Sequence, residues 1–304
     1  MEKIIKIICD QDFAQKEQPR LDSYLANNLE DYSRSYLQGL IDDGNVSMNG
    51  KVAKKSSLVV KKGDEIIVSI PPAKQYDLTP QKVDFEIIDI QEDFIIINKP
   101  AGLIVHPANS CSEEVTLVHG LMYSFAEFAQ FDPSERPGIV HRLDKDTSGL
   151  MIIARNQISQ SKFAAMFKNR EIHKNYLAVV SGHPDKSGKI DYPIGRHATI
   201  PTKMSHVGIC SRDALTFFEV VEYLKETTVV SVKIVTGRTH QIRVHFAAIG
   251  HGLIGDKLYG INSKLIARQA LHSWKLSFCY GGKEYFYEAT IPSDIKSLID
   301  SLDK

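Results

Sequence analysis

The sequence predicts an α+β protein in which a small N-terminal α/β module precedes a domain built on a mixed, largely antiparallel central sheet. Three observations support this. The 304 residues and their balanced charge suit one small and one large globular domain. Two short helical patterns and then short strand patterns fill the first 72 residues. Beyond residue 83, β-rich runs do not alternate regularly with helices, which disfavours a doubly wound parallel sheet.

In the N-terminal module, apolar residues at helical spacing predict a helix over 20–29 and a second over 36–41, which Ser33 can cap. Asp-Gly, Asn-Gly and Gly-Asp pairs then mark tight turns. Between these turns, short apolar alternations predict strands over 46–48 and 65–70.

A change of composition separates the two predicted domains. Residues 73–82 are polar and carry Pro80, which predicts a linker between a module at 1–72 and a domain at 83–304. Residues 157–168 form a helical pattern. The predicted strands of the larger domain are 85–88, 94–97, 150–153, 176–180 and 229–235.

Charge and hydropathy limit the protein's surroundings. The 37 basic residues balance 37 acidic ones, so net charge alone does not indicate a nucleic-acid binder. Residues 139–176, however, hold seven Lys or Arg against three Asp or Glu, a local excess of four positive charges. No apolar stretch approaches the roughly 20 residues that span a bilayer, and the N-terminal residues do not resemble a secretory signal. We therefore expect a cytoplasmic protein without a membrane partner.

The sequence predicts neither a metal site nor a bound nucleotide cofactor. Its four cysteines are far apart, without a CxxC pair. Residues 182–189 resemble a phosphate-binding loop, but five residues separate the glycines instead of four, and Ile190 stands where Ser or Thr must meet magnesium. His240 and His245 are five residues apart, which puts the rings on different faces of a helix or strand. A surface turn and two unrelated histidines are the favoured interpretations.

The segment 137–150 carries the clearest chemical signal. Charged and turn-forming residues lie there between two apolar runs, so the loop presents its side chains. On residue type alone, Asp144 can equally be a solvated carboxylate paired with Arg142 or Lys145.

The run HRLDKDTSG at 141–149 resembles the defining motif of the RluA-type pseudouridine synthases. Segments 98–107, 174–180 and 236–245 are similar to that family's other motifs, in the family's order. The first 72 residues resemble the RNA-binding module named after ribosomal small-subunit protein four. Together the resemblance covers roughly nine-tenths of the chain, on motif counting, and it implies the pseudouridine synthase fold.

This resemblance implies an enzyme that isomerises uridine in RNA without a metal or cofactor. It assigns the essential carboxylate to Asp144, its ion-pair partner to Arg243, and the ring against the target base to Tyr176. Arg142 is implied to fill the gap that the flipped base leaves. Further contacts to substrate or RNA are expected from His141, Arg238, Arg20, Arg34, Lys54 and Lys55.

The expected partner is structured RNA, with large-subunit ribosomal RNA favoured and transfer RNA open, and no obligate protein partner is indicated. The alternative is a non-catalytic RNA-binding or ribosome-assembly factor on the same scaffold. A binding protein has no physical need for Asp144, Tyr176 and Arg243 together, which argues against it. For Lys54 and Lys55, a solvated face remains an alternative to phosphate contact.

Overall fold

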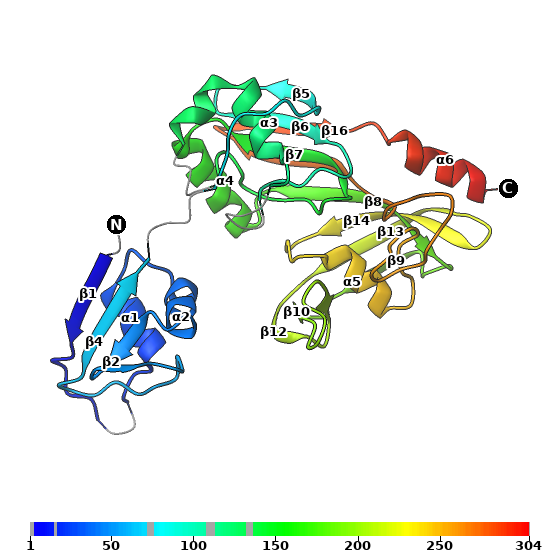
Figure 1. Cartoon of the computed structure of the whole chain (residues 1–304). Coiled ribbons are helices and arrows are strands. Elements are labelled where there is room, and N and C mark those ends of the chain that lie inside the picture. Colours follow the sequence, from blue (N-terminus) through cyan, green and yellow to red (C-terminus); the bar gives the residue numbers. More distant parts are fainter. Residues whose placement is uncertain (1–2, 15–16, 72–75, 108–112, 132–135, 304) are drawn as a thin grey trace. The chain divides into compact units, whose positions relative to one another are not determined.

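A computed structural model describes residues 3–14, 17–71, 76–107, 113–131 and 136–303, and divides into two compact units (Figure 1). The units are Met1–Lys74 and Gln75–Lys304. Residues 73–75 of the predicted linker lie outside the described residues. Its remainder packs on the second unit, because Leu78 is buried there and His119 Nε2 donates to the carbonyl oxygen of Asp77 at 2.9 Å. Residues 76–82 are therefore part of the second unit's surface.

The first unit is a four-stranded antiparallel sheet with two helices. The strand order is β1-β4-β2-β3. Both predicted helices and both predicted strands are confirmed, and Ser33 caps α2 by accepting from the backbone N–H of Tyr36 at 3.2 Å. Residues Leu21, Leu25, Leu37 and Ile41 bury the inner faces of the helices against the sheet. The elements are β1 (Lys3–Ile8), α1 (Leu21–Asn28), α2 (Arg34–Asp42), β2 (Val46–Met48), β3 (Lys51–Val52) and β4 (Glu65–Ile70).

A nine-stranded sheet forms the centre of the second unit, and the prediction of a mixed, largely antiparallel sheet is confirmed. Its order is β5-β6-β7-β15-β8-β14-β13-β9, with β16 also paired to β15. In the described part of the chain, β7 and β15 pair in parallel and the other neighbours pair antiparallel. The strands are β5 (Glu86–Ile90), β6 (Phe94–Lys99), β7 (Ser148–Ala154), β8 (His173–Ser181), β9 (Ser187–Ile190), β13 (Thr216–Tyr223), β14 (Thr227–Ile234), β15 (Leu271–Tyr280) and β16 (Lys283–Glu288).

Helices cover both faces of this sheet (Figure 1). Alternate residues of a strand point to opposite faces, so on β6 Ile95 and Ile97 join one core while Phe94 and Ile96 join another. Helix α3, the 3-10 helix η1 and helix α5 pack on the first face, whereas α4 and α6 pack on the second. These helices are α3 (Leu117–Ser124), η1 (Ala126–Gln130), α4 (Gln157–Asn169), α5 (Gln241–Ala248) and α6 (Ser293–Leu302).

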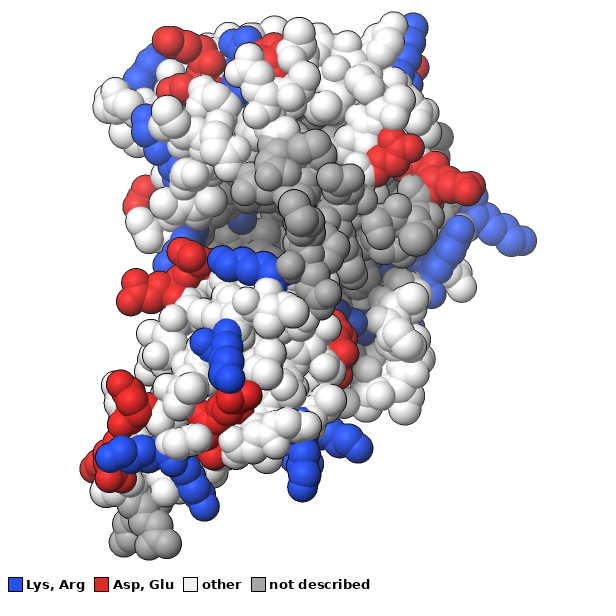
Figure 2. Space-filling view, turned by 60° about the vertical axis from the view of Figure 1, so that its left-hand side comes forward, with Lys and Arg blue, Asp and Glu red and all other residues white. Residues whose placement is uncertain are grey.

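A small three-stranded antiparallel sheet is inserted between β9 and β13. It consists of β10 (Ile194–Arg196), β11 (Met204–Ser205) and β12 (Ile209–Arg212). On the face drawn in Figure 2, basic and acidic side chains of the described residues are interspersed, in keeping with the zero net charge. None of the helices in the described ranges is both long and apolar enough to cross a membrane.

Candidate active site

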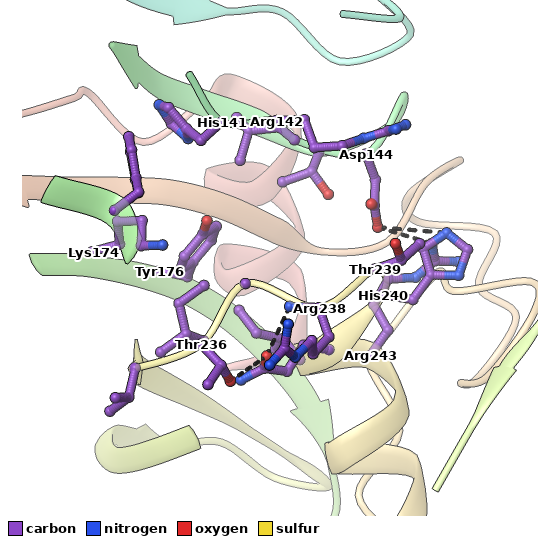
Figure 3. A pocket seen from close by; sticks show the side chains of 18 of the residues that line it. His141, Arg142, Asp144, Lys174, Tyr176, Thr236, Arg238, Thr239, His240 and Arg243 are labelled. Carbon is purple, nitrogen blue, oxygen red and sulfur yellow. Dashed lines mark hydrogen bonds and ion pairs between the residues drawn. The ribbon is translucent and has the colours of Figure 1, made fainter. Parts of the chain in front are cut away.

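Three of the four motif segments meet around one cavity of about 510 Å³ in the second unit (Figure 3). Its walls are the loop before β7, the end of α4, the start of β8, and the turn between β14 and α5. This volume lies in the range of roughly 300–1,000 Å³ that is usual for small-molecule sites. The predicted site residues that line it are His141, Arg142, Asp144, Tyr176, Arg238 and Arg243.

Lys99 fixes the backbone of the loop that carries Asp144 through hydrogen bonds. The Lys99 ammonium is fully buried and donates to three carbonyl oxygens, those of Pro100, Leu103 and Lys145, at 2.8–3.1 Å. Its burial lowers the pKa of Lys99 to about 7. The backbone N–H of Gly102 also donates to the Lys145 carbonyl at 2.9 Å. The 98–107 segment therefore contributes to the site by fixing the backbone next to Asp144.

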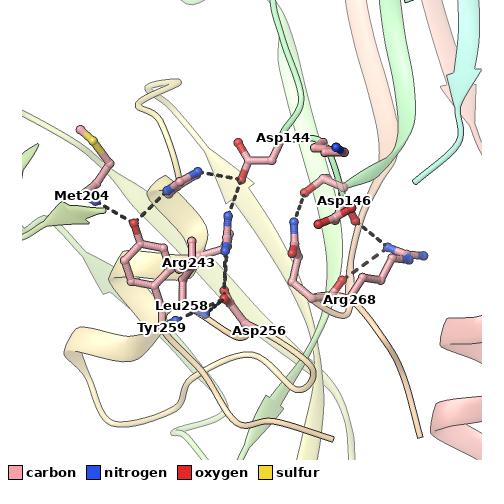
Figure 4. Close-up of polar contacts among 12 residues, drawn as sticks. Asp144, Asp146, Met204, Arg243, Asp256, Leu258, Tyr259 and Arg268 are labelled. Atoms are coloured by element: carbon pink, nitrogen blue, oxygen red, sulfur yellow. Dashed lines mark hydrogen bonds and ion pairs between the residues drawn. The ribbon is translucent and has the colours of Figure 1, made fainter. Parts of the chain in front are cut away.

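Asp144 is one end of an Asp–Arg–Asp arrangement (Figure 4). Its Oδ2 accepts from Arg243 Nη1 at 3.1 Å. The other edge of the Arg243 guanidinium donates from Nε and Nη2 to the two carboxylate oxygens of Asp256, at 2.7 and 2.9 Å. Asp256 is fully buried, whereas the Asp144 side chain remains 21% exposed towards the cavity. The buried pair therefore orients a guanidinium that holds the accessible carboxylate in place.

His240 is a second neighbour of Asp144 in the cavity (Figure 3). The Tyr259 hydroxyl accepts from the backbone N–H of Met204 at 2.7 Å and lies 2.8 Å from His240 Nδ1. The other ring nitrogen of His240, Nε2, is directed at Asp144. That nitrogen is 3.9 Å from Asp144 Oδ2, and burial lowers the pKa of His240. A neutral imidazole therefore lies beside the carboxylate.

Tyr176 and His141 form part of the cavity's inner surface. Tyr176 is 5% exposed on β8, and burial raises its pKa, so the phenol stays protonated. His141 Nε2 accepts from the backbone N–H of Ile152 at 2.8 Å, and its ring packs on Phe167 at 4.7 Å between centroids. Burial lowers the pKa of His141 to about 3. His141 Nε2 is therefore engaged in holding the loop, while the half-buried ring still lines the cavity, and the predicted RNA contact of His141 stays a prediction.

The remaining predicted RNA contacts differ in how their side chains are engaged. Arg142 is exposed at the cavity, whereas Arg238 is half-buried and donates from Nε to the Asp213 carbonyl at 3.0 Å. In the first unit, Arg20 and Arg34 both pair with the fully buried Asp22, at 3.1 and 2.9 Å. Their side chains stay 51% and 52% exposed, so each has a face left for another ligand. The two predicted lysines of this unit, Lys54 and Lys55, are exposed.

Sequence analysis missed three residues of this site, Lys174, Asp256 and Tyr259. Lys174 lies in the third motif segment but received no role, and Gly-Asp-Lys at 255–257 is typical of a solvated turn. Only the fold shows that these side chains point inward. In the described ranges, no three His, Cys, Asp or Glu side chains gather as metal ligands would.

Comparison with known families agrees with this arrangement. Residues 93–248 match the family model described as RNA pseudouridylate synthase, and residues 19–66 match the S4 domain. The first match contains every residue that lines the cavity except Leu271.

Individual relatives extend the match over most of the chain. "Uncharacterized RNA pseudouridine synthase YlyB" of Bacillus subtilis is 37% identical over 95% of this chain and 96% of its own. "Ribosomal large subunit pseudouridine synthase D" of Escherichia coli is 36% identical over 92% and 90%. The solved structure of human RNA Pseudouridylate Synthase Domain Containing 1 superimposes with a TM-score of 0.56 at 26% identity, covering 72% of this chain and 94% of that one. The chain therefore belongs to the RNA pseudouridylate synthase family, as an RluA-type member with an N-terminal S4 domain.

Proposed function

We propose that this RNA pseudouridine synthase acts on uridines of large-subunit ribosomal RNA and that Asp144 is its catalytic carboxylate. The name of the E. coli relative, which specifies the large ribosomal subunit, supports the choice of RNA. The observation that carries the mechanism is the position of Asp144: it is accessible in the cavity and fixed by Arg243, which is itself held by the buried Asp256.

The reaction needs few chemical groups. The N1–C1′ bond of uridine breaks, a C5–C1′ bond forms, and the proton lost from C5 is balanced by one gained at N1, so no external reagent is consumed. The Asp144 carboxylate attacks or stabilises C1′ as the first bond breaks. Arg243 aims that carboxylate, because its Nη1 donates to Asp144 Oδ2 at 3.1 Å.

The other predicted residues position the RNA. Tyr176 offers a buried ring against which the target base packs, and the exposed Arg142 takes the space of the flipped base in the RNA stack. The first unit, which contains the S4 domain, supplies phosphate contacts through the half-exposed Arg20 and Arg34 and through the exposed Lys54 and Lys55.

Asp144→Asn tests the catalytic assignment. The amide keeps the side chain's shape, and Arg243 keeps its two bonds to Asp256, so the fold should persist while pseudouridine formation falls below detection. The measurements are pseudouridine formed in single-turnover reactions, RNA affinity and the melting temperature, with the exposed Asp185→Asn as control. Turnover by the Asp144→Asn enzyme at a rate near that of the parent would remove Asp144 from the mechanism.

The RNA target is tested by mapping pseudouridines in total RNA from cells with and without the gene, and then by complementing with the Asp144→Asn enzyme. We expect sites in large-subunit ribosomal RNA to disappear and to return only with the parent enzyme. Loss of sites confined to transfer RNA would reassign the substrate. Unchanged pseudouridine maps, together with a ribosome-assembly defect that the Asp144→Asn protein rescues, would favour the non-catalytic alternative.

A further inference from the structure

The cavity wall carries far more positive than negative charge. Of the described residues, six cationic side chains line it against the single carboxylate of Asp144. The pKa values of the two histidines of the wall are lowered, so they add no charge at neutral pH. The six cations are Arg142, Lys168, Lys174, Arg170, Arg238 and Arg243.

Burial divides these cations into two groups. Arg142, Lys168 and Arg170 are exposed and Arg238 is half-buried, whereas Lys174 and Arg243 are only 8% and 5% exposed. The two buried cations then differ in their partners. Arg243 is bonded to two carboxylates, but no ion pair joins Lys174 to an acidic side chain in the described part of the chain.

The surroundings of the Lys174 ammonium are well defined. Its Nζ lies 5.0 Å from the centre of the Phe167 ring. A methyl group built on Gly237, in the turn after β14, would stand 3.8 Å from the same Nζ. Lys174 and Tyr176 are two residues apart on β8, so their side chains leave the same face of the strand, and Figure 3 shows the ammonium beside the phenol ring. The ammonium is therefore placed where a base packed on Tyr176 would meet it.

A buried ammonium that faces the Phe167 ring but has no carboxylate partner keeps much of its desolvation cost. Burial lowers the pKa of Lys174 to about 8, and no neighbouring carboxylate offsets this effect. A group held at such a cost inside an active site points to a partner that arrives with the substrate. A phosphate is the less suitable partner here, because four cations at or near the rim are more accessible to the RNA backbone than this one.

We propose that Lys174 is a further catalytic residue: its ammonium donates a hydrogen bond to a carbonyl oxygen of the target uracil and stabilises the negative charge that the base acquires. This inference rests on the proposed function. When the N1–C1′ bond breaks, its electron pair stays with the base and spreads onto the carbonyl oxygens, while C1′ is balanced by the Asp144 carboxylate. The ammonium keeps its proton throughout, so the step adds no proton transfer to the reaction. A fixed donor at such a developing charge acts like an oxyanion hole.

Lys174→Met tests this proposal, because methionine has a similar length and no charge. We expect the single-turnover rate constant at saturating RNA to fall about 10²–10³-fold, the usual effect of losing one oxyanion donor. The Kd for the same short RNA should change by less than about threefold, since rim cations bind the backbone. Lys162→Met, an exposed lysine of α4 outside the cavity wall, is the matched control and should leave both values unchanged. A normal melting temperature for the Lys174→Met enzyme shows that it has folded.

The pH dependence gives a second readout. The charged and titratable groups on the elements around Lys174 are Asp144, His141, Arg142, Lys168, Arg170, His173, Tyr176, Arg238, His240 and Arg243. The pKa of His141 lies near 3, that of His240 is lowered and that of Tyr176 is raised, so these three do not titrate near pH 8. Two lysines near Asp144 titrate in this range, Lys99 with a pKa of about 7 and Lys174 with a pKa of about 8. The parent rate should therefore decline in two steps, and the step above about pH 8 belongs to Lys174. Lys174→Arg, which stays charged, should retain part of the rate without that decline.

Three results would overturn the proposal. A Lys174→Met enzyme with a normal rate constant but weakened RNA binding would make Lys174 a phosphate ligand. A parent rate that rises through pH 8, with an inactive Lys174→Arg enzyme, would make the neutral amine a general base. Normal rate and normal affinity would make Lys174 structural. Each result is obtained with a parent enzyme that forms pseudouridine, so it is distinct from failure of the proposed function, in which the parent itself is inactive.

Discussion

Asp256→Asn is the change for which the structure gives the clearest expected magnitude. The Asp256 carboxylate is fully buried and accepts four hydrogen bonds. Two come from Arg243 Nε and Nη2 at 2.7 and 2.9 Å, and two from the backbone N–H groups of Leu258 and Tyr259 at 2.9 and 3.2 Å (Figure 4). Burial by itself would raise the pKa of Asp256, but these bonds outweigh it and the pKa is lowered.

Asparagine keeps one acceptor oxygen and replaces the other, which accepts from Arg243 Nε, with a donor. Removing one partner of a buried ion pair costs roughly 3–5 kcal/mol, because the remaining charge is left without compensation. Arg243 keeps its bond to Asp144, and the amide oxygen still accepts from Leu258 and Tyr259. We therefore expect the free energy of unfolding to fall by about 3 kcal/mol for Asp256→Asn and by about 5 kcal/mol for Asp256→Ala.

Catalysis should suffer as well, because Arg243 is then positioned from one side only. A displacement of about 1 Å in a catalytic group can reduce the rate about 10²-fold, so we expect a loss of this order at saturating RNA. Urea unfolding gives the stability, and single-turnover pseudouridine formation gives the rate. The exposed Asp300→Asn on α6 serves as control.

The stability of the two proteins at acid pH tests whether the Asp256 charge causes the difference. A carboxyl group whose pKa is lowered in the folded state stabilises the protein above its unfolded pKa, and this contribution is lost as the pH falls through the folded value. The stability difference between the parent and Asp256→Asn should thus be full at neutral pH and shrink below about pH 4. An Asp256→Asn enzyme as stable and as active as the parent at pH 7 would refute the view that Asp256 holds Arg243 in place.

Two further predictions concern the backbone and the first unit. Gly149 has φ 121°, and an added Cβ would stand 2.3 Å from the Ser273 carbonyl oxygen. Gly149→Ala should therefore lower the free energy of unfolding, measured in urea, by about 3 kcal/mol. Gly237→Ala is the control and should leave this free energy unchanged, because the nearest atom to its added Cβ is 3.8 Å away. A chain beginning at Tyr76 keeps the cores of the second unit, so it should melt cooperatively and modify a short RNA. Its affinity for full-length large-subunit ribosomal RNA should fall about tenfold or more, because the phosphate contacts of the first unit are lost. Unchanged affinity would make the first unit dispensable for targeting.

Much of the sheet could be predicted from the sequence, because its central strands are continuous β-rich runs. Residues 94–97, 150–153 and 176–180 are buried on both faces, and each lies within a strand of the structure. Helix α5 was not predicted, since its buried positions include Gln241, Arg243 and His245 and so lack an apolar period. The strands β9 to β12 are only two to four residues long, which gives too few positions for an alternation to stand out.

In the candidate site, the sequence located the residues whose spacing matches a family motif and missed those that act through the fold. Asp256 is 112 positions beyond Asp144 in the chain and has no motif partner, so a turn is the natural interpretation of its surroundings. Arg20 and Arg34 were predicted to contact RNA, which stays a prediction, and their pairing with a buried Asp22 depends on how α1 and α2 meet. A sequence shows that a residue is charged, whereas burial and partners decide what the charge does.

The partners of the two buried cations, Lys174 and Arg243, suggest why the site contains both. Asp144, Asp256 and Arg243 together carry one negative charge, and the Lys174 ammonium carries one positive charge. In the view of Figure 3, Lys174 and Asp144 lie on opposite sides of the Tyr176 ring. Breaking the glycosidic bond separates charge in the same sense, because the sugar becomes positive and the base negative. With the proposed roles of Asp144 and Lys174, the site would hold an anion at the sugar and a cation at the base. Such a fixed, preorganised electrostatic field favours a charge-separated transition state.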